Sequence, residues 1–153
     1  MIEAIPTSIF SKNFRLRQQD KLVGEFGTSL WREQARVELE EGTYNLRREG
    51  FCSGDFYIEK DGKVVASATK PSIFRNVFQI DLPNHHLTLR KQSLLNRRLA
   101  VFEGDKQIGS VYPRSIFARR FNIDLPSDWP LASRIFVFWL AFLIWNRQNA
   151  AAS

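Results

Sequence analysis

Eight positively charged side chains stand in four adjacent pairs along the chain, and these residues are the best suited to bind a ligand. They are Arg47, Arg48, Arg90, Lys91, Arg97, Arg98, Arg119 and Arg120. A guanidinium group presents parallel N–H donors that match two oxygens of a phosphate. The formal net charge of +6 and the isoelectric point near 9.8 also favour polyanionic partners. The pairs are predicted to bind anionic headgroups; a solvated, charged sheet face gives the same pattern, and the sequence leaves both interpretations open.

Other reactive residue types lack the neighbours that catalysis or metal binding requires. His85 and His86 are adjacent, so on a strand their rings would point to opposite faces, and no Cys or acidic cluster completes a ligand set. Cys52, the single cysteine, is predicted to be a packed or loop thiol. Asp81 and Asp124 each precede Leu-Pro and fit strand-end turns. No nucleotide-binding, nucleophile-elbow or zinc-protease motif occurs. The sequence predicts no enzyme, no cofactor and no metal site.

The elements that must position the basic pairs show a period of two. Apolar residues alternate with polar ones along most of the chain, as at Val37 and Leu39 and at Phe78 and Ile80. This pattern is typical of half-buried antiparallel strands. Turn signals such as Asp-Gly and Gly-Asp separate the alternating segments. Eleven or twelve short strands are therefore predicted before Leu125.

An internal repeat relates two of the basic pairs. Residues 70–83 and 113–126 share eight of fourteen positions at an offset of 43, and Ser-Ile-Phe occurs three times in the chain. The repeated Phe is predicted to be a packing anchor. At the same offset Arg47 corresponds to Arg90, and both follow a leucine that is expected to face inward. Both arginines should then face outward, and they form a basic strip if the repeat copies pack as neighbours.

One segment near the C-terminus is apolar on every face of a helix. Ile135–Trp145 carries no charge, and Arg134 and Arg147 bound it closely. Eleven helical residues rise only about 16 Å, whereas a bilayer core needs about 30 Å. We therefore predict a helix over about 129–147 that is enclosed by the rest of the protein, followed by a frayed tail over 148–153.

A sheet with one apolar face and a helix with no polar face can cover each other. Both requirements are met by a mainly β fold, a closed antiparallel barrel of roughly twelve strands around the buried hydrophobic C-terminal helix. Residues 1–153 are predicted to form this single domain, with strands over about 10–125. The absence of a signal peptide and the single cysteine lead us to expect a cytoplasmic location, with peripheral contact to a membrane as an option.

This combination resembles the tubby C-terminal-like superfamily, which includes tubby domains, phospholipid scramblases and LURP-one-related proteins. The resemblance lies in the strand series, in Ile135–Trp145 at the end of the chain and in the length of the chain. It implies a twelve-stranded barrel around a hydrophobic C-terminal helix. It also implies phosphoinositide binding through basic residues on the barrel, as in tubby domains. Calcium-driven scrambling is not expected, because the chain has no acidic calcium loop.

The sequence thus favours a non-catalytic binding or scaffold module that recognises anionic phospholipid or phosphoinositide headgroups. One alternative is a nucleic-acid-binding basic β-domain, in which exposed aromatic rings would stack on bases. Another is a tail-anchored membrane protein whose β-domain lies in the cytosol. The sequence identifies no protein partner and no oligomeric state.

Overall fold

The computed structural model describes residues 1–8, 12–29, 33–49, 54–71, 75–115 and 119–152. Within these ranges twelve β-strands precede one α-helix. The elements are β1 (Ile2–Pro6), β2 (Asn13–Gln18), β3 (Lys21–Ser29), β4 (Gln34–Leu39), β5 (Gly42–Glu49), β6 (Asp55–Lys60), β7 (Lys63–Thr69), β8 (Phe78–Leu82), β9 (His85–Lys91), β10 (Leu99–Glu103), β11 (Lys106–Pro113), β12 (Phe121–Asp124) and α1 (Leu131–Ala152).

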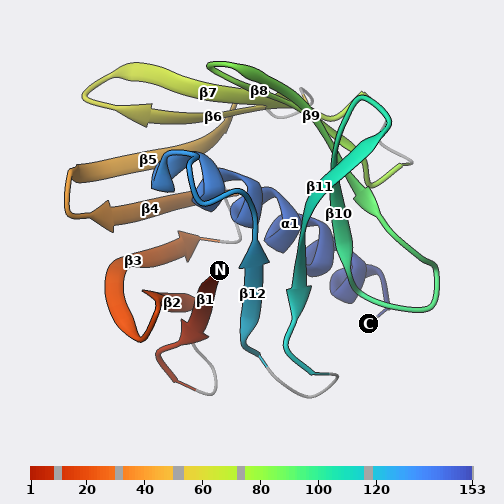
Figure 1. Cartoon of the computed structure of the whole chain (residues 1–153), viewed down its shortest axis with the longest axis horizontal. Helices are drawn as coiled ribbons and strands as arrows, with labels where there is room; N and C mark the ends of the chain where they lie inside the picture. Colours follow the sequence, from red (N-terminus) through yellow and green to blue (C-terminus); the bar gives the residue numbers. More distant parts are fainter. Residues whose placement is uncertain (9–11, 30–32, 50–53, 72–74, 116–118, 153) are drawn as a thin grey trace.

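The strands form a closed barrel in which each strand is antiparallel to its neighbours along the chain (Figure 1). β1 completes the ring by pairing with β12, where Ile2 lies opposite Ile123 and Ala4 lies opposite Phe121. Closure gives each of the twelve described strands two hydrogen-bonded neighbours, so none of these strands has an open edge to pair with another chain. The predicted antiparallel barrel is confirmed.

The period-two pattern places apolar side chains inside the barrel. Val37 and Leu39 of β4 and Phe78 and Ile80 of β8 are buried, and the residue between each pair is exposed. Because successive side chains of a strand point to opposite faces, one alternating sequence supplies both the core and the solvated surface. The strands thus give the barrel an apolar lining that requires an apolar filling.

Tight turns connect several strands through left-handed backbone. Asp61 (φ 52°) and Gly62 (φ 78°) form the β6–β7 turn, and Gly104 (φ 60°) lies in the β10–β11 turn, as the sequence predicts. Gln19 (φ 50°) and Asp20 (φ 61°) form the β2–β3 turn without a glycine. Side chains in this region of φ are strained, so the β2–β3 turn costs some of the stability that the barrel gains elsewhere.

α1 fills the interior of the barrel. Every residue of Ile135–Ala141 is 0% exposed. The Trp139 ring lies 5.8 Å from Phe56 on the barrel wall, and the Phe138 ring lies 5.7 Å from Phe14, both in edge contacts. The predicted enclosure of the helix by protein is confirmed. In the ranges that the structure describes, no helix is long and apolar enough to span a bilayer.

The predicted element boundaries need two corrections. β1 lies upstream of the predicted strand range of 10–125, because a five-residue strand ending at Pro6 shows little alternation and is stabilised by pairing with β12 and β2. The helix was predicted over about 129–147 with a frayed tail over 148–153, but α1 runs from Leu131 to Ala152. Its last residues are mainly alanine, the strongest helix former, and they continue a helix that is already anchored in the barrel.

Candidate anion-binding surface

The up-and-down strand order divides the barrel into two different ends. The connections β1–β2, β3–β4, β5–β6, β7–β8, β9–β10 and β11–β12 lie at one end, which we call the connection end. The short β2–β3, β4–β5, β6–β7, β8–β9 and β10–β11 turns and the β12–α1 segment lie at the other, which we call the turn end. α1 enters at the turn end, and its C-terminal end lies beside the β9–β10 connection at the right of Figure 1.

The connection end carries most of the positive charge. We count the described side chains in each connection, the last two residues of the strand before it and the first two residues of the strand after it. We add Arg147, which lies near the C-terminal end of α1. The basic residues are Lys12, Arg48, Lys70, Arg75, Arg90, Lys91, Arg97, Arg98, Arg114, Arg119, Arg120 and Arg147. The acidic residues selected in the same way are Glu33, Glu49 and Asp55. Seven of the eight sequence-predicted cations therefore share one end of the barrel.

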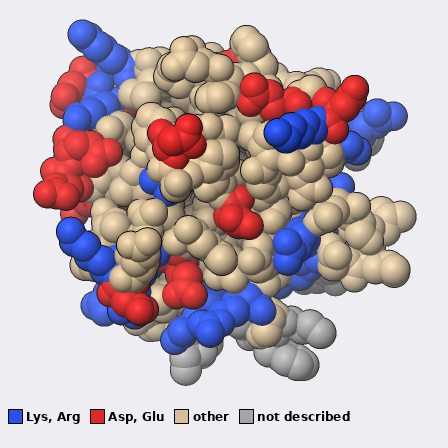
Figure 2. Space-filling model, in the orientation of Figure 1, with Lys and Arg blue, Asp and Glu red and all other residues tan. Residues whose placement is uncertain are grey.

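The turn end has the opposite composition. Its acidic residues include Asp20, Glu38, Glu40, Glu41, Glu59, Asp61, Asp81, Glu103, Asp105, Asp124 and Asp128. Its basic residues, selected in the same way, are Arg17, Lys21, Lys60, Lys63 and Lys106, and Arg134 lies in the first turn of α1. Figure 2 shows acidic atoms (red) at the left edge, where Figure 1 places the β4–β5 turn. The barrel is therefore electrically polarised along its length.

Arg47, one residue before Arg48 on β5, is the sequence-predicted cation that falls just outside this selection. Its guanidinium forms an ion pair with Glu59 on β6, with 2.7 Å between Nη2 and Oε1, and lies 4.8 Å from the centre of the Tyr57 ring. The hydrogen bond to Glu59 raises the pKa of Arg47 above its ordinary value, against the effect of burial. Arg47 thus already has an anionic partner within the barrel.

Arg48 belongs to a half-buried charged cluster at the connection end. Glu33 accepts hydrogen bonds from Arg48 of β5, at 3.1 Å, and from Arg147 of α1, at 2.7 Å. Both guanidinium groups also lie over the Phe56 ring, at 5.8 and 5.7 Å. Burial, and then the charge of Arg147, lower the pKa of nearby Lys70. The cluster ties α1 to the wall and retains more positive than negative charge.

Arg90 and Lys91 lie at the end of β9, away from Arg47. Arg90 is exposed, and its guanidinium lies 4.2 Å from the centre of the Phe102 ring on β10. Strands β6, β7 and β8 separate β5 from β9 in the barrel. The equivalent repeat strands are therefore not neighbours, and the strip that packing of the repeats would produce between Arg47 and Arg90 is not formed.

The remaining four predicted arginines gather along the ends of three adjacent strands. Arg97 and Arg98 precede β10, Arg119 and Arg120 precede β12, and β11 lies between these strands. Two strand spacings of about 4.8 Å separate the two pairs. The Arg114 amide donates to the Arg120 carbonyl, at 2.8 Å, which brings a fifth arginine to the same place. We call Arg97, Arg98, Arg114, Arg119 and Arg120 the basic edge.

A hollow of about 490 Å³ lies beside the basic edge. Arg98 forms part of its wall, with its guanidinium 3.8 Å from the centre of the Tyr112 ring and 3.3 Å from the Ser110 hydroxyl oxygen. The other lining residues are Leu95, Asn96, Arg97, Tyr112, Pro113 and Ser115. The hollow combines two cations with apolar surface and contains no carboxylate among its lining residues, so it suits an anion with an apolar extension.

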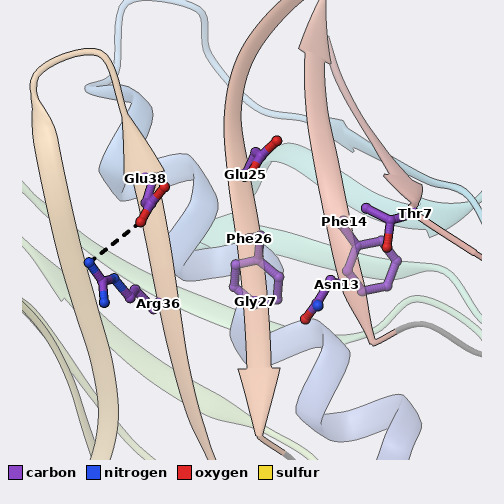
Figure 3. Close-up of a pocket in the computed structure, with 8 residues that line it drawn as sticks. All are labelled: Thr7, Asn13, Phe14, Glu25, Phe26, Gly27, Arg36 and Glu38. Carbon is purple, nitrogen blue, oxygen red and sulfur yellow. Dashed lines mark ion pairs between the residues drawn. The ribbon is translucent and has the colours of Figure 1, made fainter.

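A second hollow, across β2–β4, has a different chemistry (Figure 3). Its volume is about 250 Å³, and its lining includes the carboxylates Glu25 and Glu38. The guanidinium of Arg36, the one cation among its lining residues, pairs with Glu38 at 3.4 Å. The net charge of this lining is negative, so an anion is not attracted to it.

Each histidine pairs with a carboxylate in the described part of the molecule. His85 pairs with Glu103 at 2.9 Å and packs against the Trp129 ring, whereas His86 pairs with Asp81. The described part of the chain contains no group of three or more His, Cys, Asp or Glu residues that could hold a metal ion. Cys52 and the Ile-Phe portions of all three Ser-Ile-Phe motifs lie outside the described residues.

Sequence reasoning missed five of the twelve cations at the connection end, namely Lys12, Lys70, Arg75, Arg114 and Arg147. Arg147 was noted only as the boundary of the apolar run, and Lys70 as part of the repeat. Their roles depend on which strands lie beside the end of α1, and local periodicity carries no such information.

No protein-family model, no curated protein and no solved structure matches this chain.

Proposed function

We propose that the protein is a non-catalytic binding module whose connection end docks on anionic phospholipid at a membrane surface. The observation that carries this proposal is the separation of charge between the two ends, with arginines concentrated at one and carboxylates at the other. Such a polarised molecule orients in the field of an anionic surface before it makes contact. The acidic turn end would then face the solvent.

The basic edge has the chemistry that this role requires. Arg97, Arg119 and Arg120 are exposed, and guanidinium forks can bind two oxygens of one phosphate. Each basic residue close to an anionic membrane contributes about 1 kcal/mol to the binding free energy. A cluster of this size is therefore sufficient for peripheral attachment, and its contribution falls as salt screens the charges.

We also propose, on the basis of this architecture, that the chain belongs to the tubby C-terminal-like superfamily. The closed barrel around a C-terminal helix is the arrangement that this resemblance implies. Phosphoinositide headgroups then become the first ligands to test, because their additional phosphates match a surface of closely spaced arginines. A cytoplasmic protein that binds membranes peripherally is consistent with this reading.

Vesicle sedimentation tests the proposal directly. The wild-type protein is mixed with vesicles of phosphatidylcholine alone, with added phosphatidylserine, or with added phosphatidylinositol bisphosphate, at about 0.1 M salt. Binding is expected only to the anionic vesicles. Equal binding to all three compositions, or binding to none, would overturn the proposal.

A matched pair of triple variants locates the binding surface. Arg97→Gln/Arg119→Gln/Arg120→Gln neutralises the basic edge, and Lys21→Gln/Lys63→Gln/Lys106→Gln removes the same charge from exposed positions at the turn end. The first variant should bind anionic vesicles about 100-fold more weakly. The second should bind nearly as well as the wild type. Equal losses in the two variants would show that net charge alone drives binding.

Nucleic acid is the competing ligand class for the same cations. The Tyr57, Phe102 and Tyr112 rings each already carry an arginine over one face, which reduces the surface available for stacking on bases. A labelled single-stranded oligonucleotide added to the vesicle assay separates the two classes. If the oligonucleotide binds more tightly than the vesicles and displaces the protein from them, nucleic acid replaces lipid as the ligand.

A further inference from the structure

Two adjacent leucines project from the β9–β10 connection at the connection end. Leu94 is 92% exposed and Leu95 is 96% exposed, the highest values among the exposed large hydrophobic residues of the described chain. Leu22 and Val64, which lie next to turns at the opposite end, are only about half exposed. Single exposed apolar residues are common on proteins, whereas an adjacent, fully exposed pair suggests a surface that becomes covered.

The leucines are exposed on a backbone that several hydrogen bonds hold in place. The Gln92 amide donates to the Arg98 carbonyl, and the Arg98 amide donates to the Asn96 side chain, each at 3.1 Å. The Leu95 amide donates to the Ser93 hydroxyl, also at 3.1 Å. The connection therefore has a defined shape, and that shape directs both leucines away from the core.

The C-terminal half of α1 contacts the same connection from inside the barrel. The Trp145 indole N–H donates to the Arg97 carbonyl at 2.8 Å, and the Arg97 guanidinium lies 5.8 Å from the centre of the Trp145 ring. Trp145 is itself buried and stacked on Phe121 of β12. The tip that carries Leu94 and Leu95 is thus fixed to the rigid core of the barrel.

Positive charge borders the apolar pair on both sides. Lys91 precedes the tip, Arg97 and Arg98 follow it, and the hollow lined by Leu95 and Arg98 opens next to it. Figure 2 shows uncharged surface protruding at the right edge, where Figure 1 places the β9–β10 connection, with basic atoms (blue) beside it. This order of an apolar tip inside a basic border matches the layers of an anionic bilayer, whose phosphates lie above its hydrocarbon.

We propose that the β9–β10 connection is a membrane-insertion element. Leu94 and Leu95 enter the boundary between headgroups and acyl chains, while Arg97 and Arg98 remain at the level of the phosphates. Apolar groups of interfacial proteins reach about 5–10 Å into this boundary, a depth that a projecting pair of leucines can use. The inference rests on the proposed membrane-binding function and deepens it by adding an apolar component and an orientation.

Insertion predicts a component of binding that salt does not remove. Raising salt from about 0.1 M to about 0.5 M screens the contacts of the basic edge but leaves the burial of leucine unchanged. A purely electrostatic surface would release the vesicles over this range. A protein that inserts Leu94 and Leu95 should retain measurable binding to phosphatidylserine-containing vesicles.

The first experiment compares two exposed apolar pairs in the full chain. Leu94→Ser/Leu95→Ser should weaken binding to phosphatidylserine vesicles about tenfold or more at the higher salt. Leu22→Ser/Val64→Ser, the control at the turn end, should stay within about twofold of the wild type. Circular dichroism confirms that both variants retain the wild-type fold, as expected for exposed side chains.

The second experiment reports insertion itself. Leu95→Trp should show a blue-shifted emission, and quenching by brominated lipid, when phosphatidylserine vesicles are added. Leu22→Trp should show neither change, because the turn end faces away from the membrane. The native tryptophan signal is subtracted by using the wild-type protein in the same titration.

The outcomes separate the inference from the function on which it rests. If the wild type binds no anionic vesicle at any salt concentration, the proposed function fails and this inference fails with it. If the wild type binds but Leu94→Ser/Leu95→Ser binds equally well and Leu95→Trp is not quenched, only insertion is overturned. A dimer in sedimentation velocity that Leu94→Ser/Leu95→Ser dissolves would assign the apolar pair to a second copy of the chain instead.

Discussion

The two ends of the barrel are built from different residues. The turn end connects its strands with tight turns such as Asp61-Gly62 and places carboxylates and lysines around the entry of α1. The connection end uses longer connections and arginines, several of which lie over aromatic rings, as Arg98 does over Tyr112. The turn end therefore carries the tight hairpins, whereas the connection end gathers the arginines that, in our proposal, contact a membrane.

The substitution with the largest expected effect disrupts the core on which both ends depend. Leu140→Asp places a carboxylate at a position that is 0% exposed, where no water can solvate it. We expect a loss of at least about 4 kcal/mol in the free energy of unfolding, measured by urea denaturation, or no folded protein at all. Leu95→Asp, at an exposed position, is the control and should fold normally. A folded Leu140→Asp barrel would show that α1 is not its core.

A smaller effect is expected where the connection end is tied to the helix. Glu33→Gln removes the carboxylate shared by Arg48 and Arg147, and the three side chains are only 19–26% exposed. The two arginines then repel each other across a partly buried site, and the free energy of unfolding should fall by about 1–3 kcal/mol.

The matched control for Glu33 is Glu38→Gln on β4. Its pair with Arg36 has side chains that are 58% and 65% exposed, so screening by water leaves it a contribution of less than about 0.5 kcal/mol. Equal thermal denaturation temperatures for the two variants would show that the cluster at the connection end has no special role.

The partly buried Lys70, beside the same cluster, predicts a dependence on pH. Burial, then the charge of Arg147, lower the pKa of Lys70 from 10.5, with a further contribution from Arg48 and an opposing one from Glu33. A lowered folded-state pKa means that protonated Lys70 destabilises the fold below that pKa, and that this penalty disappears as the pH rises to 10.5.

Lys70→Met tests this dependence. The variant should melt at most about 2 °C above the wild type at pH 7, and the difference should shrink as the pH approaches 10. Lys63→Met, at an exposed position of the turn end, should show no such convergence. A difference that is constant over the whole pH range would mean that packing, and not charge, is responsible.

The smallest expected effect lies at the turn end. Asp20 holds a left-handed conformation (φ 61°) that glycine adopts without strain, so Asp20→Gly should raise the free energy of unfolding by about 0.5 kcal/mol. Chemical denaturation measures the gain, and vesicle binding should be unchanged. A change in vesicle binding would contradict the assignment of separate roles to the two ends.

Much of the fold could be predicted because each element carries its own periodic signal. The alternation of Val37 and Leu39 predicts a strand without any knowledge of its partner, and Ile135–Trp145 predicts burial from composition alone. β1 could not be predicted in this way, because its five residues are stabilised only by strands on both sides. The final turns of α1 were missed since the polar and small composition of the tail also fits a disordered end.

The candidate site could be predicted only in part. The arginine pairs are visible in the sequence, but the partners that neutralise Arg47 and engage Arg48 come from other strands and loops. The repeat predicted a shared strip for Arg47 and Arg90, whereas the strand order places three strands between them. Leu94 and Leu95 gave a local signal that was overlooked, a leucine pair between polar turn-forming residues with cations on both sides.

The closing ladder between β1 and β12 has a consequence for biosynthesis. During translation α1 leaves the ribosome after all twelve strands. The sheet can therefore close only after β12 is available to pair with β1, and its interior can be filled only after α1 is available. Until then the apolar lining of the nascent sheet is open to water and to other chains, a state that favours aggregation. We expect the barrel to complete its folding only after α1 has emerged, and a cell that makes this protein to shield the unfinished sheet with chaperones.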